Sequence, residues 1–204
     1  MTLRSLASSG SARRVVDAIA KWQFEYPIPL VVGIDGHGAA GKSTIAEQVA
    51  EELVATLVHV DDFMLSPTTQ ESTAGPTMAA YYDWQRLRQE ALEPLLAGLT
   101  ATFRAFDWEA NGFRYEPVTL APSALILLEG VSATAPALSD LIDRTVLVDT
   151  PEPERLERLH VRVTSDVWDE NWLQAEQTYF ATRPPEAFDL IVSGSTHPIY
   201  FSRH

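Results

Sequence analysis

The chemistry of this chain is concentrated in Gly36, Gly41, Lys42 and Ser43, which follow the spacing G-x-x-x-x-G-K-[ST]. Backbone N–H groups of such a glycine-rich turn can surround a phosphate, because no side chain intervenes. Lys42 would reach the outer phosphates of a nucleoside triphosphate, and the Ser43 hydroxyl would hold Mg²⁺. The predicted nucleotide-binding turn comprises Gly36, His37, Gly38, Ala39, Ala40, Gly41, Lys42, Ser43 and Thr44.

The segments on either side of this turn have the patterns of a strand and a helix, which is the context that the motif requires. Residues 30–35, LVVGID, are mostly apolar and β-branched, as in a buried strand. After the turn, the apolar residues Ile45, Val49 and Leu53 recur with helical spacing. A helix that begins near Lys42 would add the positive end of its dipole to the phosphate site.

Two other apolar segments end in carboxylates. Residues 56–60 lead into Asp61 and Asp62, and residues 124–128 lead into Glu129. Ligands of open α/β sheets bind at the carboxyl ends of the strands. Neighbouring side chains of an extended chain point to opposite sides, so at most one of the two aspartates should face a site, and both could instead be solvated turn residues. Glu129 could hold Mg²⁺ directly or through water.

The middle of the chain allows structural and functional interpretations. Residues 66–77 are predicted to form a loop. Asp83 suits a helix N-cap as well as it suits a partner for the hydroxyls of a sugar-like acceptor. The aromatic-rich residues 100–119 contain the turn signal Asn111-Gly112, which predicts a hairpin. A hairpin packed on the domain is favoured over one that covers an acceptor pocket. His59 is favoured as a packed or partly exposed strand residue over a ligand.

A later helix carries two arginines that could act on a phosphate. Thr150 and Pro151 open this helix, in which Arg158 and Arg162 lie four residues apart and share a face. They could close over the transferring phosphate. Alternatively, they pair with the glutamates at positions 154 and 157.

Five predicted strands alternate mostly with helices, which indicates a three-layer α/β fold with a parallel sheet. We expect one domain over residues 1–204. It has an N-terminal helix at about 11–25, an acceptor-side excursion at about 66–118 and a lid at about 155–180.

Composition narrows the classes of function. The net charge of −13 argues against a nucleic-acid partner, because no general basic field would offset phosphate repulsion. The absence of cysteine excludes disulfides and thiolate metal sites. No apolar run has membrane-spanning length, and the N-terminus has no apolar core of signal-peptide type. We therefore expect a cytoplasmic protein without a membrane partner, and we leave a homo-oligomer open.

An ordered series of motifs identifies a family resemblance over residues 30–194. The series is GHGAAGKST, VDDF, YYDWQRL, FDW, LLEG, an arginine-bearing helix and RPPEAFDLIVSG. It resembles the uridine kinase-like family of P-loop kinases, which also includes phosphoribulokinase and type I pantothenate kinase. The resemblance implies a P-loop kinase fold with strand order 2-3-1-4-5, and the use of ATP and Mg²⁺.

The resemblance also implies residue roles. Asp61 matches the catalytic base, Glu129 the metal-associated glutamate and Asp83 an acceptor-site aspartate. Phe106-Asp107 matches an aromatic–aspartate pair in which Tyr is common, and Arg183-Pro184 matches the loop near the adenine. The lid lacks the family's Arg-Asp dipeptide. The base-recognition His and Arg of uridine kinases have no clear match here apart from the candidate Arg114, so the phosphoryl-transfer residues match better than the acceptor site. The predicted catalytic residues are Lys42, Asp61, Arg158 and Arg162, and the predicted substrate-binding residues are Asp61, Phe63, Tyr82, Asp83, Phe106, Asp107 and Arg114.

The leading hypothesis is therefore an ATP-dependent kinase of a small hydroxyl compound, such as a nucleoside, a sugar or a pantothenate-like alcohol. A nucleotide hydrolase or switch is the second hypothesis, and it would leave the acceptor-side motifs idle. A non-catalytic nucleotide-binding module is the third, and the shortened arginine segment is its support.

Overall fold

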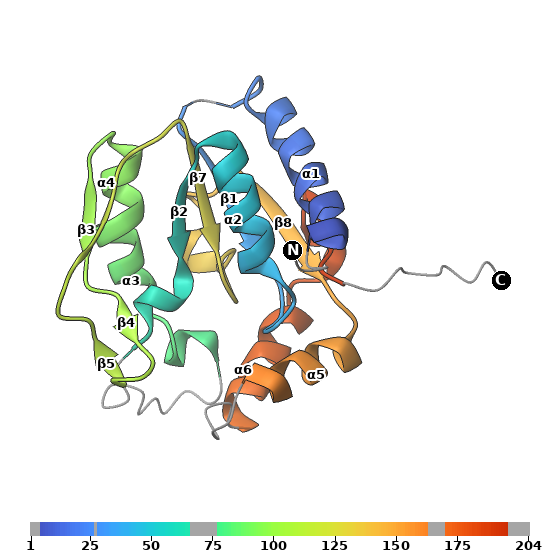
Figure 1. Cartoon of the computed structure of the whole chain (residues 1–204). Helices are drawn as coiled ribbons and strands as arrows, with labels where there is room; N and C mark the ends of the chain where they lie inside the picture. The colour runs from blue at the N-terminus through green and yellow to red at the C-terminus, as the bar shows by residue number, and fades with distance from the viewer. Residues whose placement is uncertain (1–4, 27, 66–76, 163–169, 196–204) are drawn as a thin grey trace.

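A five-stranded parallel sheet forms the centre of the computed structural model, which describes residues 5–26, 28–65, 77–162 and 170–195 (Figure 1). The strands follow the order β2-β7-β1-β8-β9. Counted in chain order within this sheet alone, this is 2-3-1-4-5, and the labels differ because β3–β6 lie outside it. The predicted fold class is confirmed. The strands are β1 (Leu30–Asp35), β2 (Thr56–His59), β7 (Leu125–Glu129), β8 (Arg144–Asp149) and β9 (Leu190–Ser193).

Helices cover both faces of the sheet, because successive strand residues point to opposite sides. Leu125 and Leu127 of β7 pack in the core beneath α1 (Ser5–Trp22) and α2 (Lys42–Leu53). Ile126 and Leu128 pack on the opposite face. There the core includes side chains of α6 (Glu170–Ala181) and of the helical stretch α3 (Trp84–Arg86), η4 (Leu87–Leu92) and α4 (Glu93–Leu96).

The stretch from α3 to α4 is not a uniform α-helix, because its η4 segment is a π-helix. This wide segment ends shortly before Pro94, which has no N–H to donate and would crowd the carbonyl of the preceding turn in a regular α-helix. The apolar residues Leu87, Leu92 and Leu95 are nevertheless buried, as their spacing predicts.

The predicted hairpin is present in two antiparallel steps. β3 (Ala101–Phe103) pairs with β6 (Val118–Leu120), and β4 (Phe106–Asp107) pairs with β5 (Gly112–Phe113). Asn111 turns the chain with a φ of 48°. Phe103 and Phe106 are buried in the core, so the hairpin packs on the domain as favoured.

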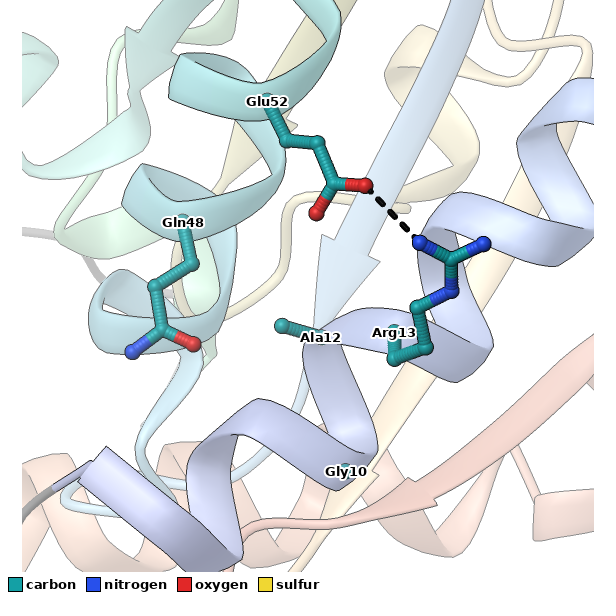
Figure 2. A pocket seen from close by; sticks show the side chains of 5 residues that line it. All are labelled: Gly10, Ala12, Arg13, Gln48 and Glu52. Carbon is teal, nitrogen blue, oxygen red and sulfur yellow. Dashed lines mark hydrogen bonds and ion pairs between the residues drawn. The ribbon is translucent and has the colours of Figure 1, made fainter.

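The helix α1 begins at Ser5 and ends at Trp22, earlier at both ends than the predicted 11–25. Its register still buries Val15, Val16 and Ile19. Between α1 and α2 lies an open hollow of about 460 Å³, where Arg13 donates a hydrogen bond to Glu52 (Figure 2). Gly10, Ala12, Arg13, Gln48 and Glu52 line the hollow, and no predicted site residue is among them.

The remaining elements join the sheet to its surroundings. Among the described residues, no helix combines the length and the apolar character needed to cross a membrane. Part of the predicted acceptor-side excursion (66–76) and part of the predicted lid (163–169) lie outside the described residues, and the division into segments stays a prediction. The elements that join the sheet to its surroundings are η1 (Val60–Phe63), η3 (Met78–Ala80), η5 (Pro136–Leu138), α5 (Glu152–Arg162) and η6 (Pro185–Ala187).

Candidate nucleotide and acceptor site

The glycine-rich turn lies where the motif predicts, between the end of β1 and the start of α2. Gly36 has a φ of 149°, and a Cβ there would collide with the Val148 carbonyl oxygen of β8. Gly41 has a φ of 95°, which places it in the left-handed region immediately before the helix. Glycine is therefore required at both positions for conformation, and at Gly36 also for space.

Lys42 is buried, with 7 % of its surface exposed, and its ammonium donates to the His37 carbonyl at 2.9 Å. The positive charge is thus held inside the turn. Ser43 and Thr44 follow in the first turn of α2 and are exposed. The predicted turn residues therefore form one continuous loop around the helix N-terminus, where the dipole favours an anion.

Glu129 connects the tips of three elements. Its Oε2 accepts a hydrogen bond from the Ser43 hydroxyl at 3.2 Å, and its Oε1 lies 2.5 Å from Nδ1 of His59. The hydrogen bond to Glu129 raises the pKa of His59, although burial opposes the shift. The predicted pair Ser43 and Glu129 is thus brought together. His59 is a partly exposed strand residue, as favoured, and its contact with Glu129 was not predicted.

Asp61 follows β2 in the turn η1, and its Oδ1 accepts a hydrogen bond from the buried Tyr82 hydroxyl at 2.8 Å. Part of the Asp61 side chain is open to solvent. Loss of hydration raises the pKa of Asp61, and the negative charge of Glu129 raises it further. The Tyr82 hydrogen bond and the Lys42 charge oppose the shift, so Asp61 lies within electrostatic reach of both the loop and Glu129.

Asp62 has different surroundings from its neighbour. Loss of hydration raises its pKa, while the charges of His59 and Arg114 oppose that shift. Arg114 lies just beyond β5 and is exposed. The hairpin therefore brings Arg114 towards the end of β2, next to the candidate site.

Several predicted substrate-binding residues have structural partners. The Asp83 carboxylate accepts from the Arg86 backbone N–H at 2.9 Å, which is the N-cap interpretation. Asp107 accepts from two backbone N–H groups in the hairpin turn, both at 3.0 Å. Phe63 and Phe106 are buried in the core. These contacts explain the residue types without a ligand, and binding roles for these residues stay predictions.

Arg158 contacts the glycine-rich loop. Its guanidinium donates to the Ala39 carbonyl at 3.0 Å and to the Gly194 carbonyl at 2.9 Å, and it pairs with Glu154 at 2.5 Å. The ion pair that the sequence allowed as an alternative is therefore present, and the same side chain reaches the loop. The Arg162 side chain lies outside the described residues.

The predicted adenine-side residues follow α6. The Arg183 guanidinium lies over the Phe188 ring at 5.2 Å, and Pro184 precedes η6. Both lie between the end of α6 and the start of β9. Their role towards a nucleotide stays a prediction.

Two buried carboxylates near the loop were not predicted. Asp35 ends β1, and the backbone or hydroxyl donors of Gly36, Ser132, Thr134 and Tyr179 all reach its carboxylate at 2.7–3.0 Å. Glu176 of α6 accepts from the Gly38 N–H at 2.6 Å. The position of Asp35 at a strand end was a usable signal, whereas Glu176 lies in an ordinary helical pattern.

The parallel sheet order and the loop between β1 and α2 define the fold of a P-loop kinase. No family model matches the chain. A uridine kinase from Halobacterium salinarum is 28 % identical over 143 residues, covering 67 % of this chain and 62 % of the relative. The chain thus spans about 62 % of the length of that curated relative.

Solved structures show the same fold. A protein described as a possible uridine kinase from Bacillus stearothermophilus has a TM-score of 0.65 at 22 % identity, covering 88 % of this chain and 97 % of that one. A candidate fructose transport system kinase from Silicibacter sp. TM1040 has a TM-score of 0.67 at 18 % identity, covering 94 % and 99 %. These likenesses show the P-loop kinase fold. In sequence, the chain is similar to several curated relatives named uridine kinase, from 28 to 32 % identical.

Proposed function

We propose that the chain is an ATP-dependent kinase that transfers the γ-phosphate to a hydroxyl of a small molecule, with a uridine- or cytidine-like nucleoside as the first candidate acceptor. The proposal rests on the contact between Ser43 and Glu129, and on the position of Asp61 two residues beyond the point where His59 of β2 pairs with Glu129. An acceptor base has no purpose in a module that only binds nucleotide. The names of the curated relatives support a nucleoside as acceptor.

The oxygen atoms of Ser43 and Glu129, 3.2 Å apart, fit Mg²⁺, which prefers oxygen ligands and keeps several waters. These two residues would hold the ion, and when bound it would neutralise charge on the β- and γ-phosphates. Within the described ranges, no cluster of three or more acidic, His or Cys side chains could hold a metal. Phosphate oxygens and water would therefore complete the coordination.

Lys42 and Asp61 would have separate roles, one towards the phosphates and one towards the acceptor. The ammonium of Lys42 binds the outer phosphates, and the carboxylate of Asp61 orients the acceptor hydroxyl and accepts its proton. Tyr82 keeps Asp61 in place through the 2.8 Å hydrogen bond. Catalysis of this kind consists mostly of positioning and electrostatics, and needs no covalent enzyme intermediate.

The test is a transfer screen with labelled ATP over nucleosides, sugars and pantothenate-like alcohols, run in parallel with Asp61→Asn. The variant should lose at least about 100-fold in turnover, because an amide cannot accept the proton. Its affinity for Mg·ATP should stay within about threefold, since Asp61 does not hold the nucleotide.

Asp62→Asn is the matched control, since it makes the same change one residue away and should keep most of the turnover. Wild-type-like turnover in Asp61→Asn would remove Asp61 from its role. Loss of the label from ATP without stimulation by any acceptor would instead indicate a hydrolase. Tight ATP binding without any transfer would indicate a binding module.

A further inference from the structure

One face of α6 is directed at the glycine-rich loop. Glu176, Tyr179 and Phe180 have the i, i+3, i+4 spacing that places side chains together on a helix. Glu176 contacts Gly38, the Phe180 ring lies 4.0 Å from the ring of His37, and Tyr179 donates to Asp35 at the end of β1. Figure 1 shows α6 beneath the loop that joins β1 to α2.

Glu176 is the acidic side chain of this face and is buried, with 3 % of its surface exposed. Its Oε1 accepts from the Gly38 N–H at 2.6 Å, and its Oε2 lies 3.1 Å from Nδ1 of His37. The guanidinium of Arg155 lies 3.9 Å away. A buried charge needs such partners, since burial alone would neutralise it.

The partners keep Glu176 ionised. Burial acts to raise its pKa, but the contacts with His37 and the Gly38 N–H outweigh burial, and the pKa of Glu176 is lowered. A hydrogen bond to an ionised acceptor is roughly twice as strong as one to a neutral acceptor. The bond to Gly38 is therefore a strong restraint on the loop backbone.

The restraint reaches the lysine of the loop. The peptide between His37 and Gly38 is held by Glu176 on its N–H side, and the carbonyl oxygen of the same peptide accepts from the Lys42 ammonium. We propose that Glu176 is a positioning residue that fixes the first half of the phosphate loop and, through it, Lys42. Resting on the proposed nucleotide site, this makes nucleotide affinity depend on α6.

The test compares Mg·ATP binding to four purified full-length proteins by calorimetry: wild type, Glu176→Ala, Glu176→Gln and the control Gln177→Ala. Glu176→Ala should weaken binding by about tenfold, the scale of one hydrogen bond to a charged group. Glu176→Gln keeps an oxygen that can accept from Gly38 but loses the charge that strengthens this bond, so its affinity should lie between those of wild type and Glu176→Ala. Gln177 is the exposed next residue, and its variant should bind as wild type does.

The rescue by glutamine separates positioning from bulk stability. Melting temperatures are measured alongside, and a loss of affinity in Glu176→Ala at an unchanged melting temperature supports the positioning role. Equal binding by wild type and Glu176→Ala would overturn this inference alone. If Glu176→Ala fails to fold, wild-type affinity in folded Glu176→Gln would overturn the inference that a charged hydrogen bond restrains the loop. A wild type that does not bind Mg·ATP at all would overturn the proposed function as well.

Discussion

At the scale of single residues, three carboxylates near the loop differ in what they contact, and these contacts separate their roles. Asp61 accepts from a tyrosine hydroxyl and is partly open to solvent. Glu129 contacts His59 and Ser43. Glu176 contacts the loop backbone and is closed off from solvent. Of the three, only Asp61 is open to solvent, which suits its proposed role towards an acceptor.

The pKa of Asp61 gives a prediction on pH dependence. A base must be deprotonated, so kcat/KM should fall as the pH falls through the raised pKa of Asp61. Tyr82→Phe removes a hydrogen bond that stabilises the carboxylate, which raises this pKa further and moves the acidic limb to higher pH. Profiles of kcat/KM between about pH 5 and 8 check this.

Tyr26→Phe is the control for that measurement, because Tyr26 contacts Arg144 far from Asp61 in the fold. An acidic limb at the same pH in Tyr82→Phe and wild type would contradict a role for Asp61 as the base.

Single residues were predictable where the sequence alone determines their place. Lys42 and Ser43 belong to a spaced motif, and Asp61 and Glu129 follow apolar strands, so their meeting at one sheet edge could be expected. His59 and Glu176 could not be predicted in this way, because their partners come from distant parts of the chain. The sequence distance between His59 and Glu129 is 70 residues, and that between Gly38 and Glu176 is 138.

At the scale of elements, α6 is tied to the sheet by a buried hydrogen bond. The Tyr179 hydroxyl donates to Asp35 at 2.7 Å, and burial and the charge of Asp35 raise the pKa of Tyr179. The same carboxylate accepts from Thr134 in the loop after β7. Asp35 therefore joins β1, the loop after β7 and α6 in one network.

Tyr179→Phe tests this tie. Loss of a hydrogen bond to a buried charge should lower the free energy of unfolding by about 1.5–3 kcal/mol, because no water replaces the donor. Denaturant unfolding measures the change. Tyr115→Phe is the control, since Tyr115 is 88 % exposed and should change stability very little. Equal free energies of unfolding for the two variants would show that the network does not stabilise the fold.

The helix and strand types followed from apolar spacing, but several boundaries did not. The π-helical η4 segment lies in a stretch whose apolar pattern predicts a plain helix, and only Pro94 signals a departure. The helix α1 extends back to Ser5, where small and polar residues carry little periodic signal. Local sequence determines the element, while packing determines where it begins and ends.

At the scale of the whole molecule, a chain with a net charge of −13 needs a local positive site if it is to bind the proposed nucleoside triphosphate. The buried Lys42, the N-terminus of α2 and Arg158 of α5 provide it. This site depends on how closely the end of β9 approaches the loop. Gly194 follows β9, and its carbonyl accepts from Arg158.

Gly194→Ala tests that close approach. A Cβ at Gly194 would overlap the Ala40 carbonyl oxygen and crowd Thr150, so either β9 or the loop must move. We expect a loss of about 1–3 kcal/mol in the free energy of unfolding, together with weaker Mg·ATP binding. Gly10→Ala is the matched control, because a Cβ there meets nothing within 4 Å and the residue lies inside α1. Alanine is the better helix former, so this variant should be neutral or more stable by up to about 1 kcal/mol. Denaturant unfolding and calorimetry on both variants measure these changes. Wild-type stability and affinity in Gly194→Ala would contradict the close packing of β9 against the loop.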